Sequence, residues 1–290
     1  MFFIAGITGH IGGATAKVLL AEGRPVRALV RNLSKAIEWA DRGVELQAGD
    51  LTDSHALAEA LEGVEAAFLM QPTPMGVTRN FPEAHALTHS IADALERTPP
   101  PRAVVLSSVG SEQDCGLGNI TQTHLLERAL DRFTFPLAFV RSGALLENNL
   151  QSLKRAGETG VFDSFLQPVD RAFPMAATAD VGAEVARLLV EGWKGRKVIE
   201  LGSYYSPTEI AEAMGKALMK PVQARAIPRD RWGTVLEHMG LPPEKAVNWE
   251  EMQDGFNNGW IDFGCQGTEA VAGTTKPVDI FGLSLQAQKA

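Results

Sequence analysis

The sequence of 290 residues is poor in cysteine, tyrosine and net positive charge. Its two cysteines, Cys115 and Cys265, are too few and too far apart for a disulfide framework, and neither has a partner at zinc-site spacing. With 27 Lys and Arg against 35 Asp and Glu, the formal net charge of −8 gives no electrostatic support for binding nucleic acid or an acidic membrane. We therefore expect neither a bound metal nor direct nucleic-acid binding.

Long apolar runs are also missing from the sequence. It contains no stretch of about 18 apolar residues, and no basic segment precedes the first apolar residues, so neither a transmembrane helix nor a signal peptide is expected. A composition that is 45% hydrophobic and 21% charged is typical of a soluble globular protein with one large or two modest domains. These features predict a cytoplasmic protein.

What the sequence does have is a glycine-rich turn at its start. Apolar residues 2–5 lead into the pattern Gly6-x-x-Gly9-x-x-Gly12, and a helix is expected from after Gly13 to about Glu22. Glycines also occur in ordinary loops, but strand, glycine turn and helix in this order are typical of a dinucleotide-binding βα junction. There the helix start offers free N–H groups to a pyrophosphate. The predicted cofactor contacts in this turn are Gly6, Thr8, Gly9, His10, Ile11 and Gly12.

Strands and helices alternate through the first half of the chain. The next predicted strands are residues 25–30, 44–48, 66–70 and 103–107. This rhythm predicts an α/β fold with a doubly wound parallel (Rossmann) sheet, in which ligands bind at the carboxyl ends of the strands. We predict an NAD(P)-binding domain over residues 1–144, with its sheet completed by later strands such as 197–201. Residues 145–290 are expected to form a smaller α/β substrate-binding lobe.

Residues at the predicted strand ends indicate which dinucleotide is bound. Arg31 ends the second strand, where an NAD-binding fold usually has an acidic residue for the ribose hydroxyls. An arginine there, with Lys35 one turn later, suits a 2′-phosphate and favours NADP(H) over NAD(H), the alternative being a solvated surface pair. Asp50 is expected to meet the adenine amino group, whereas Asp53 is better explained as a helix cap. The further candidate cofactor contacts are Asp50, Leu51, Gln71 and Ser107.

Several segments together resemble the NmrA-like branch of the short-chain dehydrogenases. They are Gly6-Ile7-Thr8-Gly9-His10-Ile11-Gly12-Gly13, Ala28-Leu29-Val30-Arg31-Asn32, Gly49-Asp50-Leu51 and Ser107-Ser108. The resemblance continues in Phe139-Val140-Arg141-Ser142-Gly143, Asn258-Gly259-Trp260 and Gly273-Thr274-Thr275, so that it covers most of the chain. It implies an atypical, NADP-preferring protein of a branch that includes quinone reductases, dye reductases and redox-sensing regulators. It also implies that Leu145-Leu146-Glu147-Asn148 and the loop around Phe162 and Phe165 line the substrate side of the nicotinamide.

The chain departs from most short-chain dehydrogenases in lacking their Tyr-x-x-x-Lys pair. In those enzymes the tyrosine protonates the nascent alkoxide, and the lysine lowers the tyrosine pKa and holds the ribose. The two tyrosines of this chain, Tyr204 and Tyr205, lie far downstream. Counting back from Glu127 places Thr123 at the lysine position and Asn119 at the tyrosine position. The usual acid is therefore absent, and the catalytic residue is unknown from the sequence.

Two other residues are candidates for catalysis. His124 is a candidate local acid, because free histidine side chains titrate near neutrality, and a structural histidine is the alternative. Ser108 could hydrogen-bond a substrate, but it lacks the Gly-x-Ser-x-Gly setting of a hydrolytic nucleophile.

Two functions remain compatible with the sequence. The first is an NADPH-dependent oxidoreductase acting on a small quinone-like, aromatic or conjugated acceptor that needs little help with protonation. The second is an NADP(H)-binding redox-sensing regulatory protein without turnover, which would have a protein partner. A monomer or a homodimer is expected in either case.

Overall fold

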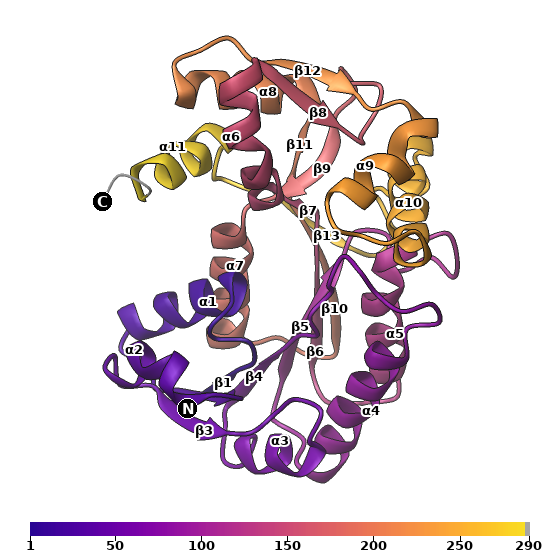
Figure 1. Ribbon diagram of the computed structural model, residues 1–290. Coiled ribbons are helices and arrows are strands. Elements are labelled where there is room, and N and C mark those ends of the chain that lie inside the picture. Colours follow the sequence, from indigo (N-terminus) through magenta and orange to yellow (C-terminus); the bar gives the residue numbers. More distant parts are fainter. Residues whose placement is uncertain (288–290) are drawn as a thin grey trace.

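The fold is built on one large parallel sheet, seen in a computed structural model that describes residues 1–287 (Figure 1). Its strands in chain order are β1 (Phe2–Ile4), β2 (Val26–Val30), β3 (Glu45–Ala48), β4 (Ala66–Leu69), β5 (Ala103–Ser108), β6 (Leu137–Ser142), β10 (Arg196–Leu201) and β13 (Glu269–Val271). They lie in the spatial order β13-β10-β6-β5-β4-β1-β2-β3, and every neighbouring pair is parallel. The strand order reverses between β1 and β4, as in a doubly wound dinucleotide-binding sheet. The predicted fold class is confirmed.

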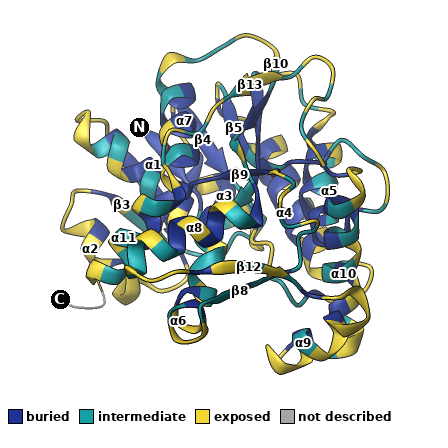
Figure 2. Cartoon of the chain, turned by 90° about the horizontal axis from the view of Figure 1, so that it is seen from above, coloured by how far each residue is buried: buried dark blue, intermediate teal, exposed yellow. Residues whose placement is uncertain are grey.

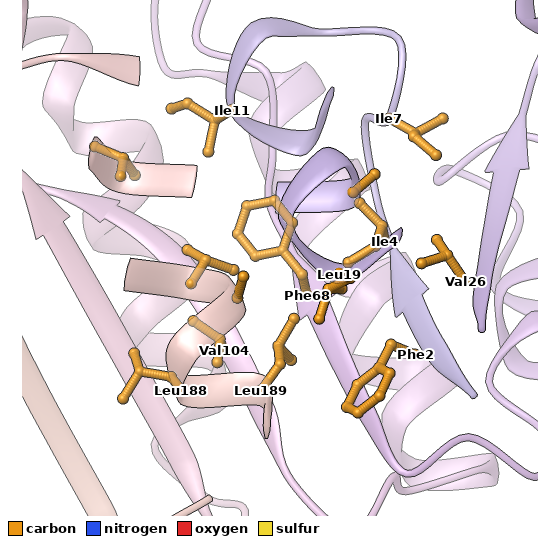
Figure 3. Packing of buried hydrophobic residues seen from close by; sticks show 14 of the residues in the cluster. Phe2, Ile4, Ile7, Ile11, Leu19, Val26, Phe68, Val104, Leu188 and Leu189 are labelled. Carbon is orange, nitrogen blue, oxygen red and sulfur yellow. The ribbon is translucent and has the colours of Figure 1, made fainter. Parts of the chain in front are cut away.

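Helices cover both faces of this sheet. One face carries α1 (His10–Ala21), α2 (Ile37–Ala40) and α7 (Thr178–Glu191), and the other carries α3 (Ser54–Ala60), α4 (Pro82–Arg97) and α5 (Thr121–Leu130). Successive strand residues point to opposite faces. Phe2 and Ile4 therefore pack in the core beside α1 and α7 (Figure 3), while Phe3 and Ala5 pack in the core beside α3 to α5. Burial on both sides explains why the inner strands β1 and β4 are wholly apolar.

Helices α1 and α7 approach each other unusually closely. A Cβ atom added to Gly182 in α7 would lie 2.5 Å from the Cβ of Ala14 and 2.9 Å from the backbone nitrogen of Thr15, both in α1. Only glycine permits this contact, because real Cβ atoms do not approach other atoms this closely. The packing brings the first turn of α7 beside the start of α1.

The remaining strands form two small sheets at the other end of the molecule from α3 (Figure 1). The first contains β7 (Ala144–Leu145), β9 (Phe173–Ala176) and β11 (Ser203–Tyr205), and the second pairs β8 (Val161–Ser164) with β12 (Gln223–Ala226). The surrounding helices are α6 (Leu150–Thr159), α8 (Pro207–Leu218), α9 (Trp232–His238), α10 (Pro243–Asn258) and α11 (Pro277–Ala287). Their inward faces are buried and their outer faces exposed (Figure 2), around two clusters of buried apolar residues separate from those of the large sheet.

The chain passes repeatedly between the large sheet and the small ones. It leaves after β6, returns for α7 and β10, leaves again, and returns for β13 at the sheet edge. The strand expected at residues 197–201 thus joins the large sheet as β10, beside β6. The domain boundary after residue 144 stays a prediction.

Local signals in the sequence were accurate at several helix starts. Ser206 and Glu209 form a capping box at the start of α8, and Asp53 caps α3 by accepting from the N–H groups of His55 and Ala56. The first helix differs from expectation, because it begins at His10 and includes Gly12. Within residues 1–287, no helix is both long enough and apolar enough to cross a bilayer.

Candidate functional site

The glycine turn joins β1 to α1 in a conformation that only glycines allow. Gly6 has φ of +65°, and its carbonyl accepts a hydrogen bond of 2.9 Å from the N–H of Gly9. A Cβ atom on Gly12 would lie 2.3 Å from the Gly6 carbonyl oxygen. Thr8, Gly9 and His10 are exposed, and no side chain among the described residues caps α1. The turn therefore presents backbone N–H groups and the positive end of the helix dipole to a ligand, as an anion site requires.

A hollow of about 500 Å³ lies beside this turn. Its wall contains Thr8, Gly9 and His10 from the turn, Lys17 from α1, and Thr178 and Ala179 from the first turn of α7. The volume is within the range of small-molecule sites. The start of α7, which no sequence signal placed here, is thus a neighbour of the predicted cofactor turn. Ile11, also a candidate contact, is buried in the core beside it.

Arg31 and Asp50 lie together at the ends of β2 and β3. The guanidinium Nε of Arg31 is 3.9 Å from Asp50 Oδ2, and its side chain remains 84% exposed. Asp50 Oδ1 accepts hydrogen bonds of 2.9 Å from both the backbone N–H and the hydroxyl of Thr52. The bond from the Thr52 N–H is the main reason why the pKa of Asp50 is lowered. The guanidinium, with exposed Lys35 one turn on, is accessible to a phosphate.

Other candidate cofactor contacts point into the protein. The Ser107 hydroxyl donates to the carboxylate of Glu127, and Gln71 donates from Nε2 to the Gln122 carbonyl while its Oε1 accepts from Thr88. The Ser107 and Gln71 side chains are each 3% exposed. Both side chains are thus engaged in hydrogen bonds inside the protein. Leu51 is half-buried against the core on the α3 side.

Neither residue at the positions of the missing pair can replace a tyrosine or a lysine. Asn119, in a 3₁₀ turn η2 (Gly118–Ile120), is 5% exposed and donates from Nδ2 to the Met75 carbonyl at 3.0 Å. Thr123 donates its hydroxyl hydrogen to the Ile120 carbonyl at 2.9 Å and accepts from Ser111 at 2.8 Å. An amide does not titrate, and this hydroxyl is already engaged. Neither side chain can therefore serve as a proton donor in place of the tyrosine.

The contacts of His124 favour a structural role. Its Nδ1 lies 2.9 Å from the Ser111 carbonyl oxygen, and because a carbonyl can only accept, Nδ1 carries the hydrogen. The ring thereby ties α5 to the segment after β5. Ser108 ends β5 and is half-buried.

A buried ion network supports the carboxyl ends of β5 and β6. Arg141 in β6 binds Glu127 through two hydrogen bonds of 2.9 and 2.7 Å, and binds Glu112 at 2.9 Å. Burial raises the pKa of the Glu112 carboxyl. From the sequence alone, Glu127 had no predicted role in the site. The feature that indicates its role is Arg141, a charged residue inside an apolar strand, which requires a buried acidic partner.

Two carboxylates hold the first turn of α7. Glu147, in the 3₁₀ turn η3 (Leu146–Asn149), accepts from the N–H of Thr178 at 2.9 Å and from its hydroxyl at 2.6 Å. Asp180 accepts hydrogen bonds of 2.7 to 2.9 Å from the N–H groups and hydroxyls of Thr274 and Thr275. Although burial opposes it, these four donors lower the pKa of Asp180. Residues 274–275 are thus hydrogen-bonded to the first turn of α7, which lines the hollow.

Sequence comparison finds a matching family and similar proteins that are named as reductases. The model of the NmrA-like family matches residues 2–266. The chain is 27% identical over 265 residues to quinone oxidoreductase 2 of Escherichia coli (strain K12), covering 90% of each protein. It is 24% identical over 254 residues to the NAD(P)H azoreductase of Xenophilus azovorans, covering 87% of this chain and 86% of the relative.

Solved structures with the same fold include two cofactor complexes. The E. coli NADPH-dependent quinone oxidoreductase complexed with NADPH superposes with a TM-score of 0.80 at 24% identity, covering 98% of this chain and 100% of that one. The Citrobacter triphenylmethane reductase complexed with NADP(H) gives a TM-score of 0.79 at 17% identity, covering 98% and 99%. At these identities the likeness establishes a shared fold.

Proposed function

Because this chain belongs to the NmrA-like family, we propose that it is an NADPH-dependent oxidoreductase acting on a small quinone-like or conjugated acceptor. The two relatives described above are named for reduction of a quinone and of an azo compound. Both acceptor types are conjugated, which favours the same class of substrate here.

The glycine turn is the observation that carries the proposal. The Gly6 carbonyl oxygen occupies the space that a Cβ atom on Gly12 would need. The first turn of α1 therefore packs directly against the glycine turn. We infer that this turn and the N–H groups of α1 hold the pyrophosphate, and that exposed Arg31 and Lys35 hold the 2′-phosphate of NADP(H). The bound cofactor would supply the hydride. NADP(H) is therefore the proposed cofactor in preference to NAD(H).

The absence of the Tyr-x-x-x-Lys pair limits the class of substrate that can be reduced. Reduction of a simple ketone develops alkoxide charge that a positioned acid must neutralise. Asn119 and Thr123 offer no such acid, as their hydrogen bonds show. A quinone accepts hydride to form a delocalised phenolate, which solvent can protonate afterwards. The site is therefore suited to electron-poor acceptors.

Turnover measurements test this function directly. We expect NADPH to be oxidised in the presence of menadione or an azo dye, and not with cyclohexanone, which needs a proton donor. The decrease of NADPH absorbance with purified protein is the measurement. Binding of NADPH without turnover of any quinone, dye or enone would contradict the proposal and favour a cofactor-sensing regulatory role.

Replacing Arg31 with alanine tests the cofactor preference. Loss of a charge-assisted contact to the 2′-phosphate should weaken NADPH binding by about 10- to 100-fold and leave NADH binding unchanged. Titration of cofactor fluorescence gives both dissociation constants. Arg24→Ala is the matched control, since Arg24 is also exposed but precedes β2 at the opposite end of the strand. Equal losses for NADPH and NADH in Arg31→Ala would contradict the assignment.

We further propose that the protein acts in the cytoplasm, as a monomer or homodimer, on small molecules. Both cysteines are free, Cys115 being exposed, which is compatible with a reducing compartment.

A further inference from the structure

The pairing of β2 with β3 places Asp50 beside Arg31. The two strands are parallel, with Val30 opposite Ala48, and the N–H of Gly49 donates to the Val30 carbonyl at 3.1 Å. The pairing thus continues one residue past the end of β3. The residues that follow the two strands, Arg31 and Asp50, are therefore neighbours at the carboxyl edge of the sheet, where a dinucleotide is expected to bind.

The carboxylate of Asp50 is held in its orientation by the turn that it begins. Its Oδ1 accepts hydrogen bonds of 2.9 Å from both the N–H and the hydroxyl of Thr52. Its backbone carbonyl accepts from the N–H of Asp53, also at 2.9 Å. These bonds occupy one carboxylate oxygen, and the other, Oδ2, lies 3.9 Å from Nε of Arg31.

This carboxylate keeps its negative charge at neutral pH. The hydrogen bonds from Thr52, together with the nearby guanidinium of Arg31, lower the pKa of Asp50 although partial burial opposes them. No other carboxylate within residues 1–287 forms an ion pair with Arg31. Arg31 therefore has one fixed anionic neighbour before any cofactor binds.

The two nicotinamide cofactors differ only at the 2′ position of the adenosine ribose, where NADPH has a phosphate and NADH a hydroxyl. A phosphate at Arg31 must compete with Asp50 for the guanidinium, and the carboxylate repels it. It can still approach, because the Arg31 side chain is 84% exposed and the ion pair is too long for a hydrogen bond. A hydroxyl carries no charge and is not repelled. Asp50 therefore opposes NADPH without opposing NADH.

We propose that Asp50 is a specificity-determining residue, which competes with the 2′-phosphate for Arg31 and thereby limits the preference for NADPH over NADH. The inference rests on the proposed function, because it requires a dinucleotide at the glycine turn with its 2′ group at Arg31. It adds NADH to that function as a second usable reductant.

The Asp50→Asn variant removes the charge and keeps the shape of the side chain. Its amide oxygen can still accept from Thr52, so we expect a melting temperature close to that of the parent protein. The ratio of the Kd for NADH to the Kd for NADPH, from fluorescence titrations, should rise by about three- to tenfold. Any contact of Asp50 with the adenine changes both constants alike and cancels in the ratio. An unchanged or lower ratio would overturn the inference.

Asp53→Asn is the matched control. It removes the same charge three residues further along the chain, where the carboxylate accepts from the N–H groups of His55 and Ala56 and forms no ion pair with Arg31. Asparagine caps a helix about as well as aspartate, so α3 should be kept. We expect the ratio to stay within about twofold of the parent value. An equal rise in both variants would show a general effect of charge and would contradict the specific role of Asp50.

A double-mutant cycle tests whether Asp50 acts through Arg31. In an Arg31→Ala background there is no guanidinium to release, so Asp50→Asn should change the ratio by less than about twofold. A rise as large as in the parent background would overturn the proposed competition. If the parent protein binds NADPH and the ratio does not respond to Asp50→Asn, only this inference fails. If the parent protein binds neither cofactor, the proposed function fails with it.

Discussion

Replacing Gly12 with alanine is expected to abolish measurable NADPH binding and to destabilise the protein by at least about 3 kcal/mol, the upper end of ordinary overpacking. The added methyl group would lie 2.3 Å from the Gly6 carbonyl oxygen, 2.6 Å from the Gly6 carbonyl carbon and 2.8 Å from the Ala5 oxygen. All three are backbone atoms, so no side-chain rotation can relieve the clash. Helix α1 would have to move away from β1, and its N–H groups would no longer converge on the phosphates.

Alanine substitutions at two other glycines serve as comparisons for Gly12→Ala. A methyl group on Gly13 would meet the Ile7 oxygen at 3.1 Å and Trp39 at 3.3 Å, so Gly13→Ala should cost less. In α11, Gly282 has no atom within 4 Å of the added methyl group, and Gly282→Ala should stabilise by about 0.5–1 kcal/mol through helix propensity. Thermal unfolding and cofactor fluorescence titration measure the series. Near-normal NADPH binding by Gly12→Ala would contradict the assigned role of the turn.

Replacing Arg141 with methionine is expected to lower the free energy of unfolding by about 3–5 kcal/mol. The guanidinium is almost completely buried and is shared by the carboxylates of Glu127 and Glu112. Methionine fills much of the same volume, but it leaves two carboxylates without their cation. Urea unfolding gives the difference. Arg128→Met is the control, because the exposed pair of Arg128 with Asp131 should contribute less than about 1 kcal/mol.

The destabilisation by Arg141→Met should depend on pH. Burial already raises the pKa of the Glu112 carboxyl in the folded state, and loss of the neighbouring guanidinium raises it further above its unfolded value. Such a group favours folding below its unfolded pKa and loses that contribution as the pH rises through the folded pKa. The loss of stability should therefore be smaller near about pH 5 than near about pH 8. Adding Glu127→Gln should recover part of the stability at the higher pH, and no recovery would show that stranded charge is not the cause.

The large sheet was predictable because its signals are local. Strands β1, β4 and β5 are short runs of mainly apolar residues, and Asp53 and Ser206 mark helix starts with hydrogen bonds inside a few residues. Arg31 could be placed at a strand end for the same reason. The predicted start of the first helix, after Gly13, was wrong. Glycines favour loops, but Gly12 packs closely against the backbone of the turn and belongs to α1, which begins at His10.

The features that the sequence did not reveal depend on long-range pairing. The hydroxyl of Ser107 points at Glu127 because Arg141 from the next strand holds that carboxylate beside it. The link from Asp180 to Thr274 joins segments 94 residues apart. In each case the residue type was visible, but its partner was fixed only by the order of strands in the sheet. The direction in which Gln71 points is likewise set by α4 and α5.

The late entry of β10 and β13 into the large sheet has a consequence for synthesis of the protein on the ribosome. β6 can pair with β5 only once residue 142 has left the exit tunnel, and its other edge then stays open until β10 follows at residues 196–201. Translation proceeds at roughly 5–20 residues per second, so the nascent chain exposes an apolar strand edge for seconds. An open edge of this kind is a template for aggregation. Chaperone capture of ribosome-bound chains should therefore be strongest after β6 emerges and should fall once β10 has left the exit tunnel.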